Sequence, residues 1–254
     1  MSSYEPIAAL LRGLEVLKAL NEGGPQAIGD LYRVTGIAKP TLVRIVETLQ
    51  HAGYVNAGNA DRRYAVTPRV LSLANGYEEQ RWLLEVTGPL LDELRSVAGW
   101  PVELGVFDTD AMVILNTSRQ PGYLSVNRKP GSRVPLFKTA LGRAYLGALP
   151  EQESDALMAK LAVRPEDEFE AARSPRNFRR LLEVIREQGY STADRETLTN
   201  GRAIAVAIVV NDRPVASVNL VAHASAMSMD ELEDTWGPKI ILLGQRIEDA
   251  LRNS

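Results

Sequence analysis

The sequence predicts an α+β fold in which a small helical region precedes a larger, mostly antiparallel sheet. Apolar residues recur at helical spacing through residues 10–49, which indicates successive short helices. Two pairs of apolar runs in the second half are each joined by a few turn-forming residues, the signal of a β-hairpin. Helical patterns separate these strands, so we expect helices to cover the faces of the sheet.

The composition allows one or two ordinary domains and restricts the chemistry. The chain has 254 residues, a formal net charge of −3 and 45% hydrophobic residues. It contains no cysteine, which excludes disulfides and thiolate metal sites. The only histidines, His51 and His223, are far apart in the chain. We therefore expect no metal and no cofactor.

The N-terminus predicts a cytoplasmic protein. Residues 1–5 lack the basic and apolar regions of a signal peptide. No apolar run approaches the roughly 20 residues that a membrane-spanning helix requires. We expect no membrane partner.

The first helix is indicated by leucines every three or four residues, namely Leu10, Leu14, Leu17 and Leu20. The sequence Gly23-Gly24-Pro25 ends it. A short second helix follows at about 28–35 and stops at Gly36.

The third predicted helix has one apolar and one polar face. Pro40 suits its first turn, and Gly53 follows its end. The apolar face contains Leu42, Ile45, Val46 and Leu49. The opposite face contains Thr41, Arg44 and Thr48, with Lys39 at the N-terminal tip. A helix-turn-helix needs this arrangement, because its second helix packs through one stripe and presents polar residues to the DNA major groove.

A basic β-hairpin follows the third helix. Strand-like residues at 54–55 and 64–66 flank a turn-rich segment that carries Arg62 and Arg63. Taken singly, each of these arginines, and Arg44, is as readily a solvated surface charge as a DNA contact. Three helices and a basic wing in this order favour a winged helix-turn-helix, with Arg44 suited to guanine and the wing to the DNA backbone.

The charge distribution favours the same division. Through Val70 the chain has eight lysines and arginines against six acids, a net charge of +2. The remainder therefore carries −5. This asymmetry is typical of a DNA-binding front and a non-binding back.

The segment 68–99 predicts a helical connector. Pro68 opens a first helical stretch, and a second has a sparse apolar seam with Gly88-Pro89 inside it, where we expect a kink or break. The seam consists of Leu83, Val86, Leu90, Leu94 and Val97. It packs either on its own domain or on a second subunit. We favour a dimer contact, because two recognition helices must meet two half-sites.

The second half predicts strands at 102–107, 111–116, 123–127, 134–136, 203–210 and 215–221. Helices are expected at 139–149 and from Ser174-Pro175 to Gly189. Ser228 and Glu231 form a capping box for the terminal helical region, which Trp236-Gly237-Pro238 should interrupt. This is the pattern of an α+β sensor domain.

The start of the predicted helix at 139 suits a carboxylate. Its free N–H groups and positive dipole end attract anions, and Ala140 and Gly142 are small enough to let a ligand approach. Arg128 is suited to pair with an acid or phenolate, although a surface salt bridge is the alternative. Asn219, in the predicted strand 215–221, is as readily a satisfied sheet-edge amide as a ligand contact.

Several motifs resemble the IclR family of bacterial transcriptional regulators along nearly the whole chain. They are Arg12-Gly13-Leu14 through Gly53-Tyr54-Val55, the stretch GSRVPLFKTALGRAYL at 131–146, Gly189-Tyr190, and GRAIAV at 201–206. Within the family the chain is most similar to regulators of aromatic-acid catabolism (hydroxyphenylpropionate or hydroxybenzoate), through Trp100-Pro101, Phe107-Asp108, 110–114 and 219–221.

The resemblance implies three parts: a winged helix-turn-helix at 1–67, a helical linker at 68–99 and a GAF-like effector domain at 100–254. The expected DNA-binding residues, from the helix faces, the wing and the front motif, are Arg12, Lys39, Thr41, Arg44, Thr48, Arg62 and Arg63. By position the resemblance implies an effector site formed by Ala140, Leu141, Asp194, Ala203, Asn219 and Val221, and Arg128, Phe137 and Thr139 complete the expected set. Many relatives have His at Phe137 and small polar residues at Ala203 and Val221, so we expect a more apolar pocket that favours an aromatic acid.

We therefore expect a DNA-binding regulator of catabolic genes that responds to a small aromatic carboxylate. There are two alternatives. The same architecture responds to a short-chain aliphatic acid instead, or the chain is a ligand-binding protein without specific DNA readout. The expected partners are double-stranded operator DNA, the effector, further copies of the chain (a dimer or a dimer of dimers) and RNA polymerase. An enzyme is not expected, because no nucleophile-elbow, phosphate-binding or dinucleotide-binding motif is present.

Overall fold

The computed structural model describes residues 5–58, 62–74, 79–118 and 128–254. It divides into two compact units, Met1–Glu78 and Glu79–Ser254. The expected strand at 123–127 lies outside the described residues.

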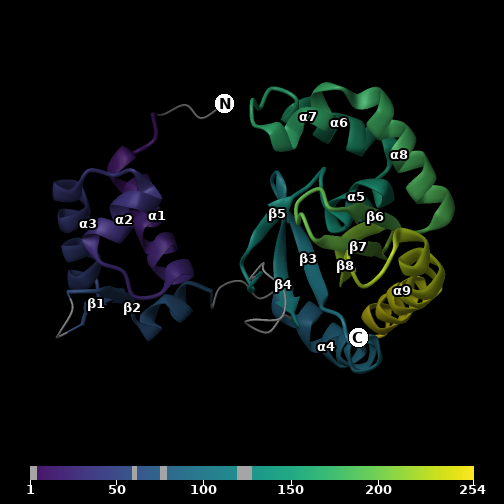
Figure 1. The fold of residues 1–254 in the computed structure, drawn as a ribbon, viewed down its shortest axis with the longest axis horizontal. Coiled ribbons are helices and arrows are strands. Elements are labelled where there is room, and N and C mark those ends of the chain that lie inside the picture. The colour runs from purple at the N-terminus through teal and green to yellow at the C-terminus, as the bar shows by residue number, and fades with distance from the viewer. Residues whose placement is uncertain (1–4, 59–61, 75–78, 119–127) are drawn as a thin grey trace. The chain divides into compact units, whose positions relative to one another are not determined.

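The first unit is a helix-turn-helix with a wing, as the sequence predicts (Figure 1). Helices α1 (Ala8–Gly23), α2 (Ile28–Thr35) and α3 (Lys39–His51) precede an antiparallel hairpin of β1 (Val55–Ala57) and β2 (Tyr64–Val66). Gly36 ends α2 with a left-handed φ of 68°, which glycine adopts without steric strain. The three helices share one core, which contains Val16, Leu20, Leu31, Leu42 and Val46.

The second unit is built on a six-stranded sheet with the order β5-β4-β3-β8-β7-β6. Its strands are β3 (Val102–Asp108), β4 (Ala111–Thr117), β5 (Arg133–Pro135), β6 (Ser191–Asp194), β7 (Gly201–Val210) and β8 (Arg213–His223). Every neighbouring pair is antiparallel. The α+β class and the antiparallel sheet are thus confirmed.

Helices cover both faces of this sheet (Figure 1). Helices α4 (Glu79–Ala98) and α9 (Met229–Arg252) contact each other, and their apolar residues pack on one face. Helix α5 (Ala140–Ala148) lies against β7 and β8, and its alanines meet those of β6 and β7. A helical layer packs beside α5; it consists of α6 (Glu151–Leu161), the 3₁₀ turn η2 (Asp167–Phe169), α7 (Glu170–Arg173) and α8 (Pro175–Gln188).

The two expected helix breaks do not occur, and a kink at Gly88-Pro89 stays a prediction. Helix α4 continues through Pro89, and α9 continues through Pro238. A proline removes one backbone hydrogen bond and crowds the preceding turn. Here the two helices pack along each other and on the sheet, with Leu91 and Ile240 fully buried, and this burial offsets the local loss. The capping box of Ser228 and Glu231 at the start of α9 is confirmed.

The expected connector is divided between the two units. The 3₁₀ helix η1 (Pro68–Ala74) lies in the first unit, with Leu71 and Leu73 exposed. In α4, Leu83 and Leu94 are buried in the core of the second unit, whereas Val97 is exposed. The buried leucines stabilise their own unit, and a dimer contact by this segment stays a prediction.

Gly142 allows the close contact between α5 and the residues before it. A Cβ at this position would lie 2.0 Å from the carbonyl oxygen of Leu136 and 2.6 Å from its carbonyl carbon. We predict that Gly142→Ala lowers the free energy of unfolding of the second unit by at least about 1–3 kcal/mol, because the backbone must move. Gly88→Ala in α4 is the control, since a Cβ there meets nothing within 4 Å. Chemical denaturation measures both; equal stability of the two variants would contradict the prediction.

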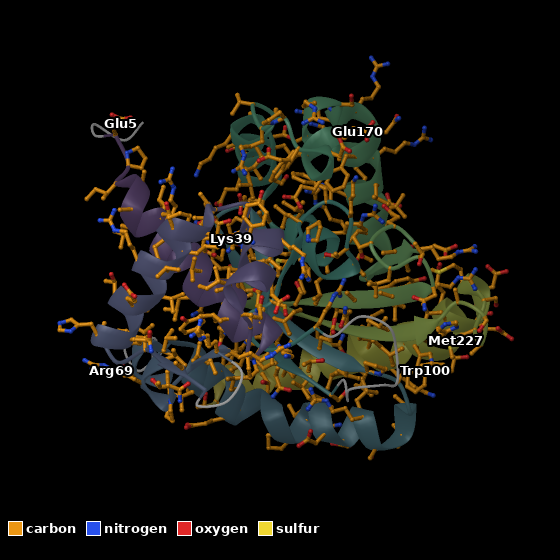
Figure 2. All side chains as sticks on the ribbon, turned by 60° about the vertical axis from the view of Figure 1, so that its left-hand side comes forward. Glu5, Lys39, Arg69, Trp100, Glu170 and Met227 are labelled. Atoms are coloured by element: carbon orange, nitrogen blue, oxygen red, sulfur yellow. The ribbon has the colours of Figure 1, made fainter. Side chains whose placement is uncertain are left out.

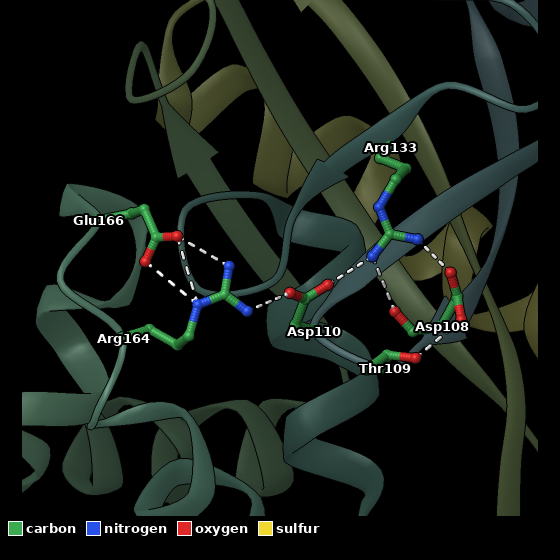
Figure 3. Close-up of polar contacts among 6 residues, drawn as sticks. All are labelled: Asp108, Thr109, Asp110, Arg133, Arg164 and Glu166. Carbon is green, nitrogen blue, oxygen red and sulfur yellow. Dashed lines mark hydrogen bonds and ion pairs between the residues drawn. The ribbon is translucent and has the colours of Figure 1, made fainter. Parts of the chain in front are cut away.

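A chain of ion pairs fixes the sheet edge that leads into α5 (Figure 3). Arg133 on β5 pairs with Asp108 and Asp110 of the β3–β4 hairpin. Asp110 also accepts a hydrogen bond from Arg164, with 3.0 Å between Oδ2 and Nη1, and Arg164 pairs with Glu166. The network therefore ties the segment after α6 to the strand that precedes α5.

Candidate functional site

The polar face of α3 is accessible in the first unit. Arg44 and Thr48 are exposed and Thr41 is half-buried, while Leu42 and Val46 are buried beneath them. These three polar residues line a groove of about 570 Å³ between α1 and α3, together with Arg12 on α1. The structure thus brings together four of the residues that the sequence analysis assigns to DNA.

Lys39, labelled in Figure 2, begins α3, and its side chain is exposed. Its ammonium nitrogen lies 5.9 Å from the centroid of the Tyr32 ring, a cation–π contact that orients it. The Thr48 hydroxyl donates to the carbonyl oxygen of Arg44 in the preceding turn, at 2.7 Å. Lys39 and Arg44 are therefore the charged hydrogen-bond donors of this face. The hydroxyl proton of Thr48 is already used, so Thr48 is suited mainly to van der Waals contact.

The wing is attached to the turn between α1 and α2. Arg63 donates from Nη1 to the carbonyl oxygen of Pro25 at 3.0 Å, and the backbones of Gln26 and Tyr64 form an isolated bridge. Arg62 is exposed with a φ of 47°. The wing arginines therefore come from a hairpin whose base is fixed to the helical core.

The second site lies over the sheet face that meets α5. Cross-strand register aligns one transverse row of residues over five strands: Thr117, Glu103, Asn219, Ala205 and Ser191. The neighbouring row on β8, β7 and β6 contains Val221, Ala203 and Ala193. Most of these side chains are small, which leaves space between the sheet and the start of α5.

A cavity occupies that space. Six of the predicted effector residues line it: Arg128, Thr139, Ala140, Ala203, Asn219 and Val221. Its volume is about 20 Å³, room for about one water molecule. A carboxylic acid with several heavy atoms therefore enters only if a wall of the cavity moves.

One wall is the segment between β6 and β7. Residues 195–198 line the cavity from this side. Arg143 of α5 binds the Glu196 carboxylate through both terminal nitrogens, with 2.7 Å between Nη1 and Oε1. Arg128 donates from Nη2 to the Thr197 hydroxyl at 3.4 Å. These contacts hold the segment over the cavity, and sequence reasoning did not identify it.

A buried ion pair lies beside the cavity, and its Arg128 lines the cavity wall. Glu103 is fully buried, and Arg128, which is only 8% exposed, donates to its Oε2 from Nη1 at 3.1 Å. Asn219 Nδ2 donates to the same oxygen at 3.2 Å. Sequence reasoning missed Glu103; the signal was a lone acid inside the apolar run 102–107. Charged groups are rarely buried unless paired, so such an acid predicts a nearby cation.

Three predicted effector residues do not line this cavity. Phe137 packs edge-to-face against Phe169 and Phe178 in the neighbouring helical layer. Leu141 is fully buried in the same cluster. Asp194 accepts hydrogen bonds from Arg202 and Arg195, and these contacts lower its pKa.

Within the described ranges, no group of three or more His, Asp or Glu residues could hold a metal ion. Among the helices of the same ranges, none is long and apolar enough to cross a membrane.

Two family models match the chain. The model described as "Bacterial transcriptional regulator IclR C-terminal" matches residues 76–248, and the "IclR helix-turn-helix domain" matches residues 9–57. Both describe transcriptional regulators rather than enzymes.

Curated relatives agree over almost the full length. The HTH-type transcriptional regulator TsaQ1/TsaQ2 of Comamonas testosteroni is 26% identical over 97% of this chain and 89% of its own. The glycerol operon regulatory protein of Streptomyces coelicolor is 30% identical over 95% of this chain and 91% of its own. Among solved structures, an IclR homologue from Microbacterium hydrocarbonoxydans complexed with 4-hydroxybenzoate is 21% identical, covers 97% of this chain and 100% of that one, and has a TM-score of 0.73. At that identity the structure supports the fold alone.

Proposed function

The chain belongs to the IclR family of bacterial transcriptional regulators, and from that premise we propose that it controls catabolic genes in response to a small aromatic carboxylate. The family carries a helix-turn-helix for DNA and a separate C-terminal domain. The observation that supports an effector site is the cavity between the start of α5 and a floor of small side chains.

DNA recognition is assigned to the exposed face of α3. Arg44 can donate two hydrogen bonds to guanine O6 and N7, and Lys39 and Thr41 lie near the N-terminal end that enters a major groove. Arg62 and Arg63 on the wing, together with Arg12 on α1, supply charge for phosphate contacts. Because one α3 reads one half-site, we propose that the chain acts as a homodimer or a dimer of dimers.

The effector is assigned to the α5 cavity. In the first turn of α5 the N–H of Gly142 donates to Thr139 Oγ1, whereas the N–H groups of Ala140 and Leu141 have no intrahelical partner and attract a carboxylate. Beneath them, Ala193, Ala203 and Val221 offer an apolar surface suited to a ring. The Microbacterium homologue was solved with 4-hydroxybenzoate, an acid of the class proposed here. The Streptomyces relative regulates a glycerol operon, so the class must be tested.

A thermal-shift comparison of acids distinguishes the two effector classes. A ligand that binds only the folded protein stabilises it by about 2.7 kcal/mol at 100 times its Kd. We expect benzoates and phenylpropionates to raise the melting temperature, and acetate, pyruvate and glyoxylate to leave it unchanged. A shift with the aliphatic acids alone would replace the aromatic effector with a short-chain one.

A further inference from the structure

An unpaired acceptor lies in the floor of the α5 cavity. Asn219 is 1% exposed and lines the cavity. Among the described residues, nothing donates to its Oδ1. A buried polar atom without a partner costs about 1–3 kcal/mol, so such atoms are uncommon in folded proteins. A donor inside the cavity, either a water molecule or a ligand group that replaces it, would satisfy this one.

The orientation of the Asn219 amide is set by its neighbours. The two ends of an amide are distinguished by their hydrogen bonds, and an ionised carboxylate only accepts. Glu103 is paired with Arg128, so its Oε2 accepts from Asn219 Nδ2. Oδ1 is therefore the end left for a ligand, and it accepts but cannot donate.

The distance to the helix start defines the shape of the ligand. Asn219 on β8 is two strands away from Ser191 on β6, and Ser191 Oγ donates to the carbonyl oxygen of Ala140 at 2.6 Å. Two strand spacings are about 9–10 Å. A carboxylate held at the β6 side of the start of α5 and a donor at Asn219 would therefore sit at opposite ends of the ligand.

We propose that Asn219, oriented by the Glu103–Arg128 pair, recognises a hydroxyl group at the end of the effector remote from its carboxylate. This inference rests on the proposed effector site and deepens it: the effector is a para-hydroxylated aromatic acid. An acid that lacks the hydroxyl leaves Oδ1 unpaired. A hydroxyl beside the carboxylate lies at the wrong end.

Calorimetric titration of the full chain with 4-hydroxybenzoate, benzoate and 2-hydroxybenzoate tests the proposal. In the unchanged protein we expect 4-hydroxybenzoate to bind about 5- to 150-fold more tightly than the other two. Asn219→Leu should bind 4-hydroxybenzoate and benzoate equally. Glu103→Gln frees the amide to turn and should reduce the preference without abolishing benzoate binding.

Ser217→Ala is the matched control. Ser217 Oγ is also buried without a partner among the described residues, on the same sheet face, but Ser217 does not line the cavity. The hydroxyl preference should survive this substitution. Equal binding of 4-hydroxybenzoate and benzoate by the unchanged protein would overturn the role of Asn219 but leave an aromatic effector standing. If none of the three acids binds, while lactate or 3-hydroxybutyrate does, both the para-hydroxyl proposal and the aromatic effector are wrong.

Discussion

Glu103→Ala is expected to lower the free energy of unfolding of the second unit by about 3–5 kcal/mol, because it leaves the buried Arg128 guanidinium without its counter-charge. Asn219 Nδ2 loses its acceptor in the same substitution, which adds to the loss. Urea denaturation monitored by tryptophan fluorescence measures the change, because all three tryptophans, Trp82, Trp100 and Trp236, belong to the second unit.

Removing both charges distinguishes pairing from packing. In the double variant Glu103→Leu/Arg128→Met no charge is left unpaired, so its stability should exceed that of Glu103→Ala. If the single and double variants lost equal stability, the loss would come from packing, and the ion pair would not organise the cavity floor.

Arg44→Ala is expected to weaken binding to the operator by about 1–3 kcal/mol, the contribution of one bidentate contact to guanine. The loss should be larger for operator DNA than for unrelated DNA of the same length, because a base contact carries sequence information and a phosphate contact does not. Fluorescence anisotropy with labelled duplexes at one fixed salt concentration measures both affinities.

Arg33→Ala provides the control for Arg44. Arg33 lies on α2, is exposed, and pairs with Asp30 one turn earlier, outside the proposed interface. The Arg33→Ala substitution removes the same charge as Arg44→Ala and should leave the ratio of specific to nonspecific affinity unchanged. Equal effects of the two substitutions would show that Arg44 contributes charge alone.

Local sequence patterns predicted the ends of helices correctly where no tertiary packing opposed them. Gly36 and Gly189 each end a helix in the left-handed conformation, and Ser228 with Glu231 caps α9, as expected. Pro89 and Pro238 predicted breaks that α4 and α9 do not have, because the packing of the two helices outweighs the local preference against proline. Helix α6 was not predicted, since its apolar residues Met158 and Leu161 form only a short stripe between charged positions.

The candidate site was harder to predict because it depends on register. Arg128, Thr139 and Asn219 were named from the sequence and line one cavity. Glu103 was not, because only the pairing of β3 with β8 places it opposite Asn219. Phe137 was named because the family resemblance places it at the effector pocket, yet its ring packs into the adjacent aromatic cluster. A linear sequence gives no direction for a side chain in a loop between a strand and a helix.

Occupation of the α5 cavity is expected to change the affinity of α3 for its operator. The most direct test is the operator affinity of the full chain with and without saturating 4-hydroxybenzoate, measured by anisotropy. Coupling between two sites is commonly about 1–3 kcal/mol, so we expect a change of about 5- to 150-fold, in either direction, in the unchanged protein. The change should be much smaller in Asn219→Leu at the same ligand concentration. An operator affinity that stays constant while calorimetry shows the cavity to be filled would contradict the account.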